Sequence, residues 1–202
     1  MRSLSSRDVS SALVTGFTTG IIAWRILLFL GHPLPFGIAP GVLVPLIPAL
    51  WLAGVQLGYL LGMVFRPFVQ FGRFAAIGFA NAAVDFGVLY AFIAATGLAT
   101  GGAYAAFKAV SFSVATVHSY LWNKYWAFDA GRSRGGQREV LAFLGVALSS
   151  LLVNVGAASV VVALRPATFA VASWAGIGAV VGSAAALVFS FTGFRLFVFN
   201  RR

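Results

Sequence analysis

The stretch that decides the fold runs from Phe74 to Thr96 and reads FAAIGFANAAVDFGVLYAFIAAT. It is long enough to cross a bilayer core of about 30 Å as one helix, which takes roughly 20 mainly apolar residues. Its one acid, Asp85, lies near the middle, and Asn81 lies one helical turn earlier on the same face. An ionisable group at that depth is costly unless it is paired or hydrated. We therefore predict that Asp85 and Asn81 belong to a functional site.

The rest of the chain has the same apolar character. Of its 202 residues 60% are hydrophobic and 9% are charged, and the mean hydropathy is +0.96, which excludes an ordinary soluble domain. Barrel strands would be half as long and would alternate polar with apolar residues. The sequence therefore predicts an all-α fold, a polytopic membrane helical bundle of about six transmembrane helices, with Asp85 as the only acid inside a span. The predicted spans are Val9 to Leu30, Gly41 to Phe65, Phe74 to Thr96, Ala103 to Trp126, Val140 to Leu164 and Val171 to Phe199.

Basic residues fall mainly on one side of these spans. With the N-terminus in the cytoplasm, that side collects 11 of the 14 lysines and arginines, as the positive-inside rule requires. We expect a multi-pass protein of the cytoplasmic (plasma) membrane with both termini in the cytoplasm, and no nucleic-acid partner despite the net charge of +10. A further role open to the 132–138 loop is attraction of anionic lipid headgroups. The cytoplasmic set is Arg2, Arg7, Arg66, Arg73, Lys124, Arg132, Arg134, Arg138, Arg195, Arg201 and Arg202.

An internal repeat is the next signal. FAAIGFANAAVDFG from Phe74 aligns without gaps on FLGVALSSLLVNVG from Phe143, and the later stretch SYLWNKYWAF from Ser119 aligns on SFTGFRLFVF from Ser190. These pairings predict two tandem helical hairpins in parallel orientation, preceded by an extra N-terminal hairpin. The alternative is chance similarity between apolar helices. The predicted division is residues 1–72 for the extension and 73–202 for the four-helix domain.

A polar stripe marks the predicted fourth helix. Lys108, Ser111, His118 and Trp122 fall within an arc of about 80° at 100° per residue. Lys108 starts about 8 Å and Asp85 about 16 Å below the outer boundary, from a rise of about 1.5 Å per residue. A flexible lysine spans that gap, so we predict an Asp85–Lys108 pair that faces the bundle interior. The alternative is an ion pair that only fixes helix register. For His118, helix packing is favoured over a proton relay.

The end of that helix is rich in aromatic and basic residues. Tyr120, Trp122, Tyr125 and Trp126 surround Asn123 and Lys124, a composition typical of headgroup level. Anchoring is the simple interpretation, and binding of a phosphate headgroup by Asn123 and Lys124 is the functional one. Arg195 does the same work in the second copy. Arg25, about 8 Å from the outer boundary, either extends to water or holds a phosphate, and Ser149, Ser150 and Asn154 are expected as interhelical hydrogen-bond partners.

The stretches RFAAIGFANAAVDFGVLY from Arg73, HSYLWNKYWAFD from His118 and the final FRLFVFNRR together resemble the GtrA-like family of small membrane proteins. The resemblance covers residues 73–202, two thirds of the chain. It implies work with polyprenyl-phosphate-linked sugars in surface polysaccharide or glycan synthesis, either by flipping the lipid or by anchoring a glycosyltransferase. Carried over by position, the family's polar residues are Asn81, Asp85, Asn123 and Lys124. The chain departs from the family by its extra N-terminal hairpin and by Phe194-Arg195 at the second closing end.

These observations favour a translocator over an enzyme. The chain has no cysteine, two histidines far apart and no recognisable nucleophile–base set, so we expect no catalytic residues, no cofactor and no metal. In the translocator a groove with Asn81, Asp85 and Lys108 receives the sugar-phosphate headgroup while the prenyl tail stays in membrane lipid. Two alternatives are an anchor for a glycosyltransferase, held through the 132–138 loop and the aromatic-basic ends, and a small cation exporter. Both a homodimer and a working monomer are open.

Overall fold

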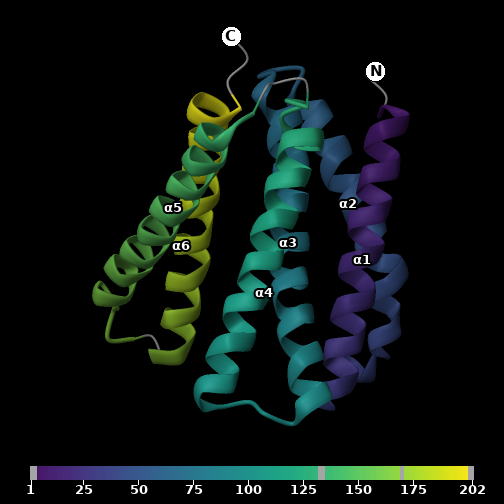
Figure 1. Cartoon of the computed structure of the whole chain (residues 1–202). Helices are drawn as coiled ribbons and strands as arrows, with labels where there is room; N and C mark the ends of the chain where they lie inside the picture. The colour runs from purple at the N-terminus through teal and green to yellow at the C-terminus, as the bar shows by residue number, and fades with distance from the viewer. Residues whose placement is uncertain (1–3, 132–134, 169–170, 200–202) are drawn as a thin grey trace. The chain divides into compact units, whose positions relative to one another are not determined.

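The computed structural model describes residues 4–131, 135–168 and 171–199, and every regular element in these ranges is helical (Figure 1). The prediction of an all-α fold with six long helices is therefore confirmed. Arg2, Arg132, Arg134, Arg201 and Arg202, which carried part of the charge argument, lie outside the described residues. The elements are α1 (Ser6–Leu30), the 3-10 turns η1 (Pro35–Gly37) and η2 (Pro40–Val42), α2 (Leu43–Leu61), α3 (Pro67–Thr96), α4 (Gly101–Trp122), the π-helix η3 (Asn123–Ala127), α5 (Gln137–Ala163), α6 (Val171–Gly193) and the π-helix η4 (Phe194–Val198).

Five stretches are long and apolar enough to cross a membrane: Ser6–Leu30, Pro40–Leu61, Pro67–Thr96, Gln137–Ala163 and Ile177–Val198. The chain is thus a multi-pass membrane protein. α4 does not reach the same hydropathy, because Lys108, His118 and several hydroxyl side chains interrupt it. Its 22 residues still rise about 33 Å, which is sufficient for a span. Five of the six predicted spans are therefore shown by composition and length, and α4 stays a predicted one.

The structure divides into two compact units, residues 1–129 and 130–202. The first unit holds the predicted N-terminal hairpin, α1 and α2, together with α3 and α4; the second holds α5 and α6. α1 and α2 pack directly on α3, so the extension and the start of the predicted four-helix domain share one core. The predicted domain division after residue 72 stays a prediction.

In the first unit α3 lies at the centre and contacts α1, α2 and α4 (Figure 1). Glycines allow the close crossings. A Cβ atom on Gly16 of α1 would lie 2.6 Å from the Cα of Pro48, and one on Gly58 of α2 would lie 3.2 Å from the Cα of Gly72 in α3. Such small residues let helix backbones approach closely in membranes, where van der Waals packing drives association. The core between these helices contains the fully buried apolar residues Ala12, Val55 and Ile77, together with buried polar residues of α1 such as Thr15 and Thr19.

The second unit is a pair of helices joined near residues 164–170. Ser150 of α5 donates a hydrogen bond to the carbonyl oxygen of Ala186 in α6, at 2.9 Å, which confirms the interhelical role predicted for that serine. Asn154 packs against Gly182, where an added Cβ would lie 2.7 Å from the Asn154 side-chain oxygen. Phe143 near the start of α5 stacks on Phe194, with ring centroids 4.6 Å apart. For Ser149 the predicted hydrogen bond stays a prediction.

The closing helices of both units end in the same way. Each α-helix widens into a five-residue π-helix, η3 and η4, and each π-helix closes with a bond from a following phenylalanine. The Phe128 N–H donates to the Asn123 carbonyl at 3.0 Å, and the Phe199 N–H donates to the Phe194 carbonyl at 2.8 Å. These are the positions that the internal alignment pairs. The shared local structure agrees with that alignment, while the arrangement of the hairpins as tandem repeats stays a prediction.

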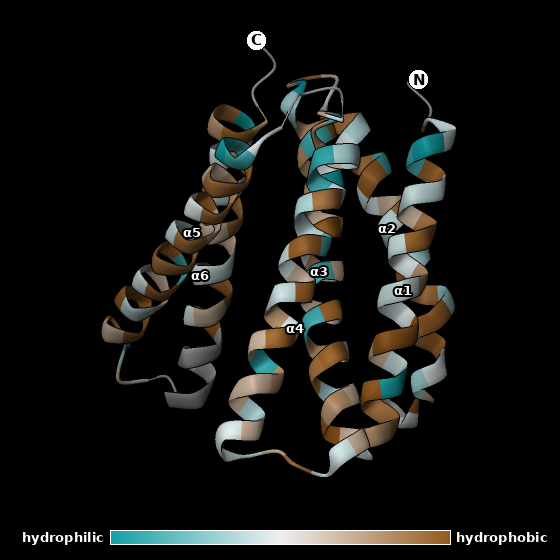
Figure 2. Cartoon of the chain, in the orientation of Figure 1, coloured by the Kyte–Doolittle hydropathy of each residue, from teal (hydrophilic) through white to brown (hydrophobic). Residues whose placement is uncertain are grey.

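Apolar side chains cover much of the outer surface of the helices. Figure 2 shows long hydrophobic stretches on α1 to α4 that are interrupted by short hydrophilic bands. Large apolar residues such as Leu152 and Phe197 leave three quarters of their surface uncovered. Contiguous apolar surface on this scale is a liability in water and is the expected surface towards lipid. The hydrophilic bands are therefore the places to look for function.

Candidate functional site

A charged cluster joins α3 to α4. The Lys108 Nζ lies 2.5 Å from the Asp85 Oδ2, and the Ser111 hydroxyl donates to the other oxygen, Oδ1, at 2.7 Å. The predicted Asp85–Lys108 pair is thus confirmed. Ser111 is fully buried, and the carboxylate of Asp85 is held on both oxygens. The Lys108 ammonium also lies 5.7 Å from the centre of the Phe86 ring, a cation–π distance.

The cluster lies deep in the predicted membrane region but is not sealed. Asp85 is followed by 11 further residues of α3, which places it about 16 Å from that end of the helix. The Asp85 side chain keeps 19% of its surface exposed and the Lys108 side chain 39%. A pair that is balanced internally and still accessible along one edge can exchange a partner for an incoming group without leaving a bare charge.

Three predicted site residues hold buried polar atoms that have no partner among the described residues. These are the Oδ1 of Asn81, one turn before Asp85, the Nδ1 of His118 and the Oδ1 of Asn123. Asn81 shares the face of Asp85 and extends the polar surface by one turn. His118 lies ten residues after Lys108, about 15 Å further along α4, where its ring contacts Trp122 at 6.2 Å. The predicted polar stripe is therefore two separate patches, and His118 is not part of the Asp85 cluster.

The predicted pair at the closing end, Asn123 and Lys124, is buried inside η3. Asn123 is 1% exposed and its amide donates to the Ser119 carbonyl at 2.8 Å, while its Oδ1 has no partner in the described part of the chain. Lys124 is 6% exposed, and its Nζ lies 3.2 Å from the Tyr120 hydroxyl. Both side chains belong to the buried part of the π-helix, together with Trp126 and Ala127. Arg195 occupies the matching position of η4 and is half-buried.

This geometry corrects the interpretation of the aromatic belt for one residue. Trp126 was expected at headgroup level, yet it is 2% exposed. Its indole N–H donates to the Asp8 Oδ1 at 3.0 Å, so it faces the protein and not the lipid. Tyr125 remains about half exposed and keeps the position expected of an anchor.

Asp8 is the centre of a polar node that sequence reasoning missed. Its buried carboxylate accepts hydrogen bonds from the hydroxyls of Ser5 and Tyr59, at 2.6 Å and 2.7 Å, and from Trp126. The Arg73 guanidinium reaches it as well, with Nε 2.7 Å from Oδ1 and Nη2 3.0 Å from Oδ2. We call these five residues the Asp8 node. It joins α1, α2, α3 and η3.

α1 begins at Ser6 and not at the predicted Val9, so Asp8 lies in its first turn, as Glu139 lies in the first turn of α5. Asp85 is therefore not the only acid in the long helices, but it is the one that lies far from a helix end. Arg73, which the sequence places on the cytoplasmic side, has a side chain that is 17% exposed and paired with Asp8. The missed signal was the spacing Ser5-x-x-Asp8, which resembles a capping box and marks a helix start. In the structure the Ser5 side chain does cap α1, accepting from the Asp8 N–H.

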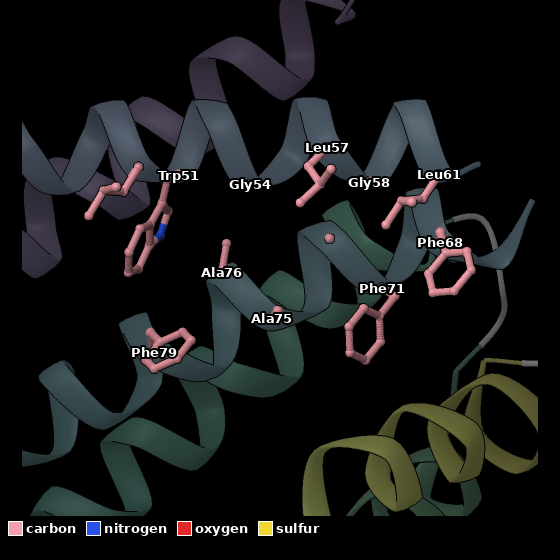
Figure 3. Close-up of a pocket in the computed structure, with 12 residues that line it drawn as sticks. Trp51, Gly54, Leu57, Gly58, Leu61, Phe68, Phe71, Ala75, Ala76 and Phe79 are labelled. Carbon is pink, nitrogen blue, oxygen red and sulfur yellow. The ribbon is translucent and has the colours of Figure 1, made fainter. Parts of the chain in front are cut away.

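An apolar groove runs between α2 and α3, away from the charged cluster. Figure 3 shows α2 above α3, with Trp51 and Phe79 towards one end and Leu61 and Phe68 towards the other. Its volume is about 310 Å³. A Cβ atom added to Gly54 would meet nothing within 4 Å, so the groove is open there. The Trp51 indole nitrogen is buried without a partner among the described residues.

The described residues hold no group of three His, Cys, Asp or Glu side chains that could bind a metal ion. The polar chemistry of the structure is instead that of paired cations, carboxylates, amides and hydroxyls. Such groups bind phosphates and sugar hydroxyls by charge and hydrogen bonding.

Comparison with known proteins gives a family match and a relative. Residues 73–199 match the family described as GtrA/DPMS, transmembrane domain. The uncharacterized membrane protein YngA of Bacillus subtilis (strain 168) is 30% identical over 79 residues, which cover 39% of this chain and 49% of that protein. The chain thus spans about half the length of this curated relative. No solved structure matches the chain. The family is linked to polyprenyl-sugar and glycan synthesis, and its members are generally non-catalytic. Since the match covers more than half of its residues, this chain belongs to the GtrA/DPMS transmembrane domain family.

Proposed function

We propose that this protein translocates a polyprenyl-phosphate-linked sugar across the cytoplasmic membrane for the synthesis of surface polysaccharide or glycan, and that it does so without catalysing a covalent reaction. The observation that carries the proposal is the Asp85–Lys108–Ser111 cluster at mid-depth between α3 and α4. Moving an anionic headgroup through hydrocarbon costs a large free energy unless polar or charged groups of the protein bind it. The cluster supplies one cation and hydrogen-bonding groups at the depth where that cost is highest.

In this proposal the residues of the cluster bind different parts of the headgroup. The Lys108 ammonium, which keeps 39% of its side chain exposed, binds the phosphate. Asp85 then turns from its lysine to sugar hydroxyls, which donate to carboxylates, while Ser111 keeps the carboxylate in place. The free Oδ1 of Asn81 accepts from a further hydroxyl one turn away. The prenyl tail stays in lipid and needs no binding site within the cluster.

The closing ends provide the cytoplasmic contacts in the same proposal. Both termini lie in the cytoplasm, as the distribution of basic residues favours. Each closing end acts within its own unit, with Asn123 and Lys124 as headgroup contacts in η3 and Arg195 as a headgroup contact in η4. Binding at η3 requires the buried Asn123 and Lys124 to become accessible, and the unpaired Oδ1 of Asn123 then accepts from a sugar hydroxyl. His118 lies between η3 and the cluster along α4.

The test is headgroup accessibility of a fluorescent polyprenyl-phosphate sugar in proteoliposomes that contain only this protein. Wild type is expected to move the headgroup to the opposite leaflet, and Asp85→Asn and Lys108→Met are expected to abolish the movement. Asp129→Asn is the matched control, because it makes the same change in a carboxylate whose ion pair with Arg7 is exposed. No movement with folded wild type would refute the proposal and favour a membrane anchor for a glycosyltransferase, checked by co-purification of that enzyme.

A charge swap separates transport from helix register. Asp85→Lys combined with Lys108→Asp restores an ion pair between α3 and α4 while it moves the cation to the other helix. If the pair only fixes register, the swapped protein regains both thermal stability and transport. If the cluster binds the headgroup, stability returns and transport does not.

A further inference from the structure

A second groove, on another side of α3, combines an apolar lining with one cation. It lies between α1 and α3, has a volume of about 410 Å³, and is lined by Ile22, Arg25 and Phe29 from α1 and by Val84, Tyr90 and Ala91 from α3, among others. Phe29 and Tyr90 meet edge to face, with centroids 6.0 Å apart. All other lining residues are aliphatic or glycine. The groove is therefore an apolar surface suited to a hydrocarbon chain, and the Arg25 guanidinium is the one cation in its lining.

The Arg25 guanidinium lies at a depth where it needs either contact with water or an anionic partner. Arg25 is exposed, lies five residues before the end of α1, and so is about 8 Å inside that end. No acid of the described residues forms an ion pair with it. An arginine at this depth is costly in lipid unless it reaches the interface or finds a negative partner. Tyr90 lines the same groove and carries a hydroxyl, the other hydrogen-bonding side chain among the lining residues.

The groove begins at the depth of the charged cluster, on another side of α3. Ile22 of α1 packs against Gly87 of α3, where a Cβ would lie 2.7 Å from an Ile22 methyl carbon. The groove lining on α3 therefore begins at Val84, next in sequence to Asp85, and continues to Ala94, a length of about 15 Å. Arg25 lies beyond that start, towards the α3 end that is remote from the Asp8 node.

We propose that this groove binds the polyprenyl phosphate carrier, with the phosphate on Arg25 and the first prenyl units along the apolar lining. One groove with one cation fits a lipid that has one chain and one phosphate, whereas bilayer glycerophospholipids carry two chains. The inference rests on the proposed function and adds a second binding site to it. The lipid occupies this groove, which extends from the depth of Asp85 towards the end of α3 that is remote from the Asp8 node. Arginine suits the role because its planar donors match phosphate oxygens in pairs.

The experiment uses full-length protein in phosphatidylcholine vesicles with a photoreactive polyprenyl phosphate, followed by mapping of labelled peptides. Labelling is expected in 21–29 and 84–94, and Arg25→Gln is expected to lower it about tenfold, the scale of losing one charged hydrogen-bonding partner. Arg25→Lys keeps a point charge and should retain part of the labelling. Arg66→Gln is the matched control, because Arg66 is also exposed but lies at the opposite end of α3.

A second pair of variants tests the groove itself. Ala91→Trp fills the apolar lining and should remove labelling, whereas Ala106→Trp, an exposed alanine of α4 outside the groove, should not. Competition then identifies the ligand: unlabelled polyprenyl phosphate should displace the probe, and polyprenol without phosphate and phosphatidic acid should not. Equal labelling of wild type and Arg25→Gln, or equal competition by phosphatidic acid, would overturn the inference.

The two proposals fail separately. Asp85→Asn should label like wild type while it no longer moves the headgroup, which shows binding in the groove without transport. If wild type labels in the groove but transports nothing, the proposed function fails and the groove remains a lipid site. If wild type transports but Arg25→Gln labels and transports normally, the groove inference fails alone.

Discussion

Replacing Asp8 with asparagine should destabilise the protein strongly, although the substitution only replaces one carboxylate oxygen with an amide nitrogen. Asparagine has nearly the shape of aspartate but removes the charge that holds Arg73 at 2.7 Å. The Ser5 and Tyr59 hydroxyls can rotate to suit an amide, whereas arginine has no acceptor and cannot. Its guanidinium would then be left largely buried beside a neutral group.

The magnitude follows from the burial of the pair. Breaking a buried ion pair by removing one partner costs about 3–5 kcal/mol. Arg73 keeps 17% of its side chain exposed, so water relieves part of the penalty, and we expect about 3 kcal/mol. The neighbouring variant Arg7→Gln is the matched control. It removes an ion pair with Asp129 whose partners are 54% and 55% exposed, and such surface pairs contribute about 0–1 kcal/mol.

The assay is the free energy of unfolding in mixed micelles, followed by tryptophan fluorescence as denaturing detergent is added. Trp126 is part of the node, so its emission should also report local loosening. The double variant Asp8→Asn with Arg73→Met should recover much of the loss, because it leaves no unpaired charge. The reasoning is refuted if Asp8→Asn costs no more than Arg7→Gln, or if the double variant is less stable than Asp8→Asn alone.

Four further substitutions test the helix packing and one hydrogen bond. Gly16→Ala places a methyl group 2.6 Å from a backbone atom of α2 and should cost about 1–3 kcal/mol, measured by the same unfolding titration. Gly182→Ala meets a carbonyl oxygen of α5 at 2.6 Å and should lower the thermal midpoint, whereas Gly156→Ala, which meets nothing within 4 Å, should raise unfolding free energy by about 0.5–1 kcal/mol. Trp126→Phe removes the indole donor to the Asp8 carboxylate and should cost about 1.5–3 kcal/mol; an unchanged midpoint would mean that this bond contributes nothing.

The sequence was sufficient for the helical plan and for the charged pair, because both depend on local quantities. The length of each apolar run predicts a span, and the depths of Asp85 and Lys108 along neighbouring helices predict their contact, which the structure contains. The Asp8 node could not be predicted in this way. Its partners Tyr59, Arg73 and Trp126 come from three other elements, which are distant in sequence. A hydropathy pattern uses an acid beside an apolar stretch only to mark where that stretch ends, so it does not indicate that the acid has partners.

The π-helical ends were missed for a different reason. Nothing in SYLWNKYWAF distinguishes a π-turn from an α-turn, because the widening is decided by which side chains the surrounding core accepts. Here Trp126 and Phe128 are both buried, which a regular helix at the edge of the bundle would not favour. The belt interpretation failed at Trp126 because aromatic composition alone does not say whether a ring faces lipid or protein.

The Asp8 node has a consequence for biosynthesis. Asp8 is translated 118 residues before Trp126, which at about 5–20 residues per second is an interval of roughly 6–24 s. During that time the carboxylate waits in the first turn of α1, at the edge of the bilayer, with Tyr59 and then Arg73 arriving one after the other. The last bond forms only when α4 has been inserted and η3 has turned inward. The node therefore completes late, and a ribosome-bound chain that stops before η3 should hold its first hairpin less firmly than the finished protein.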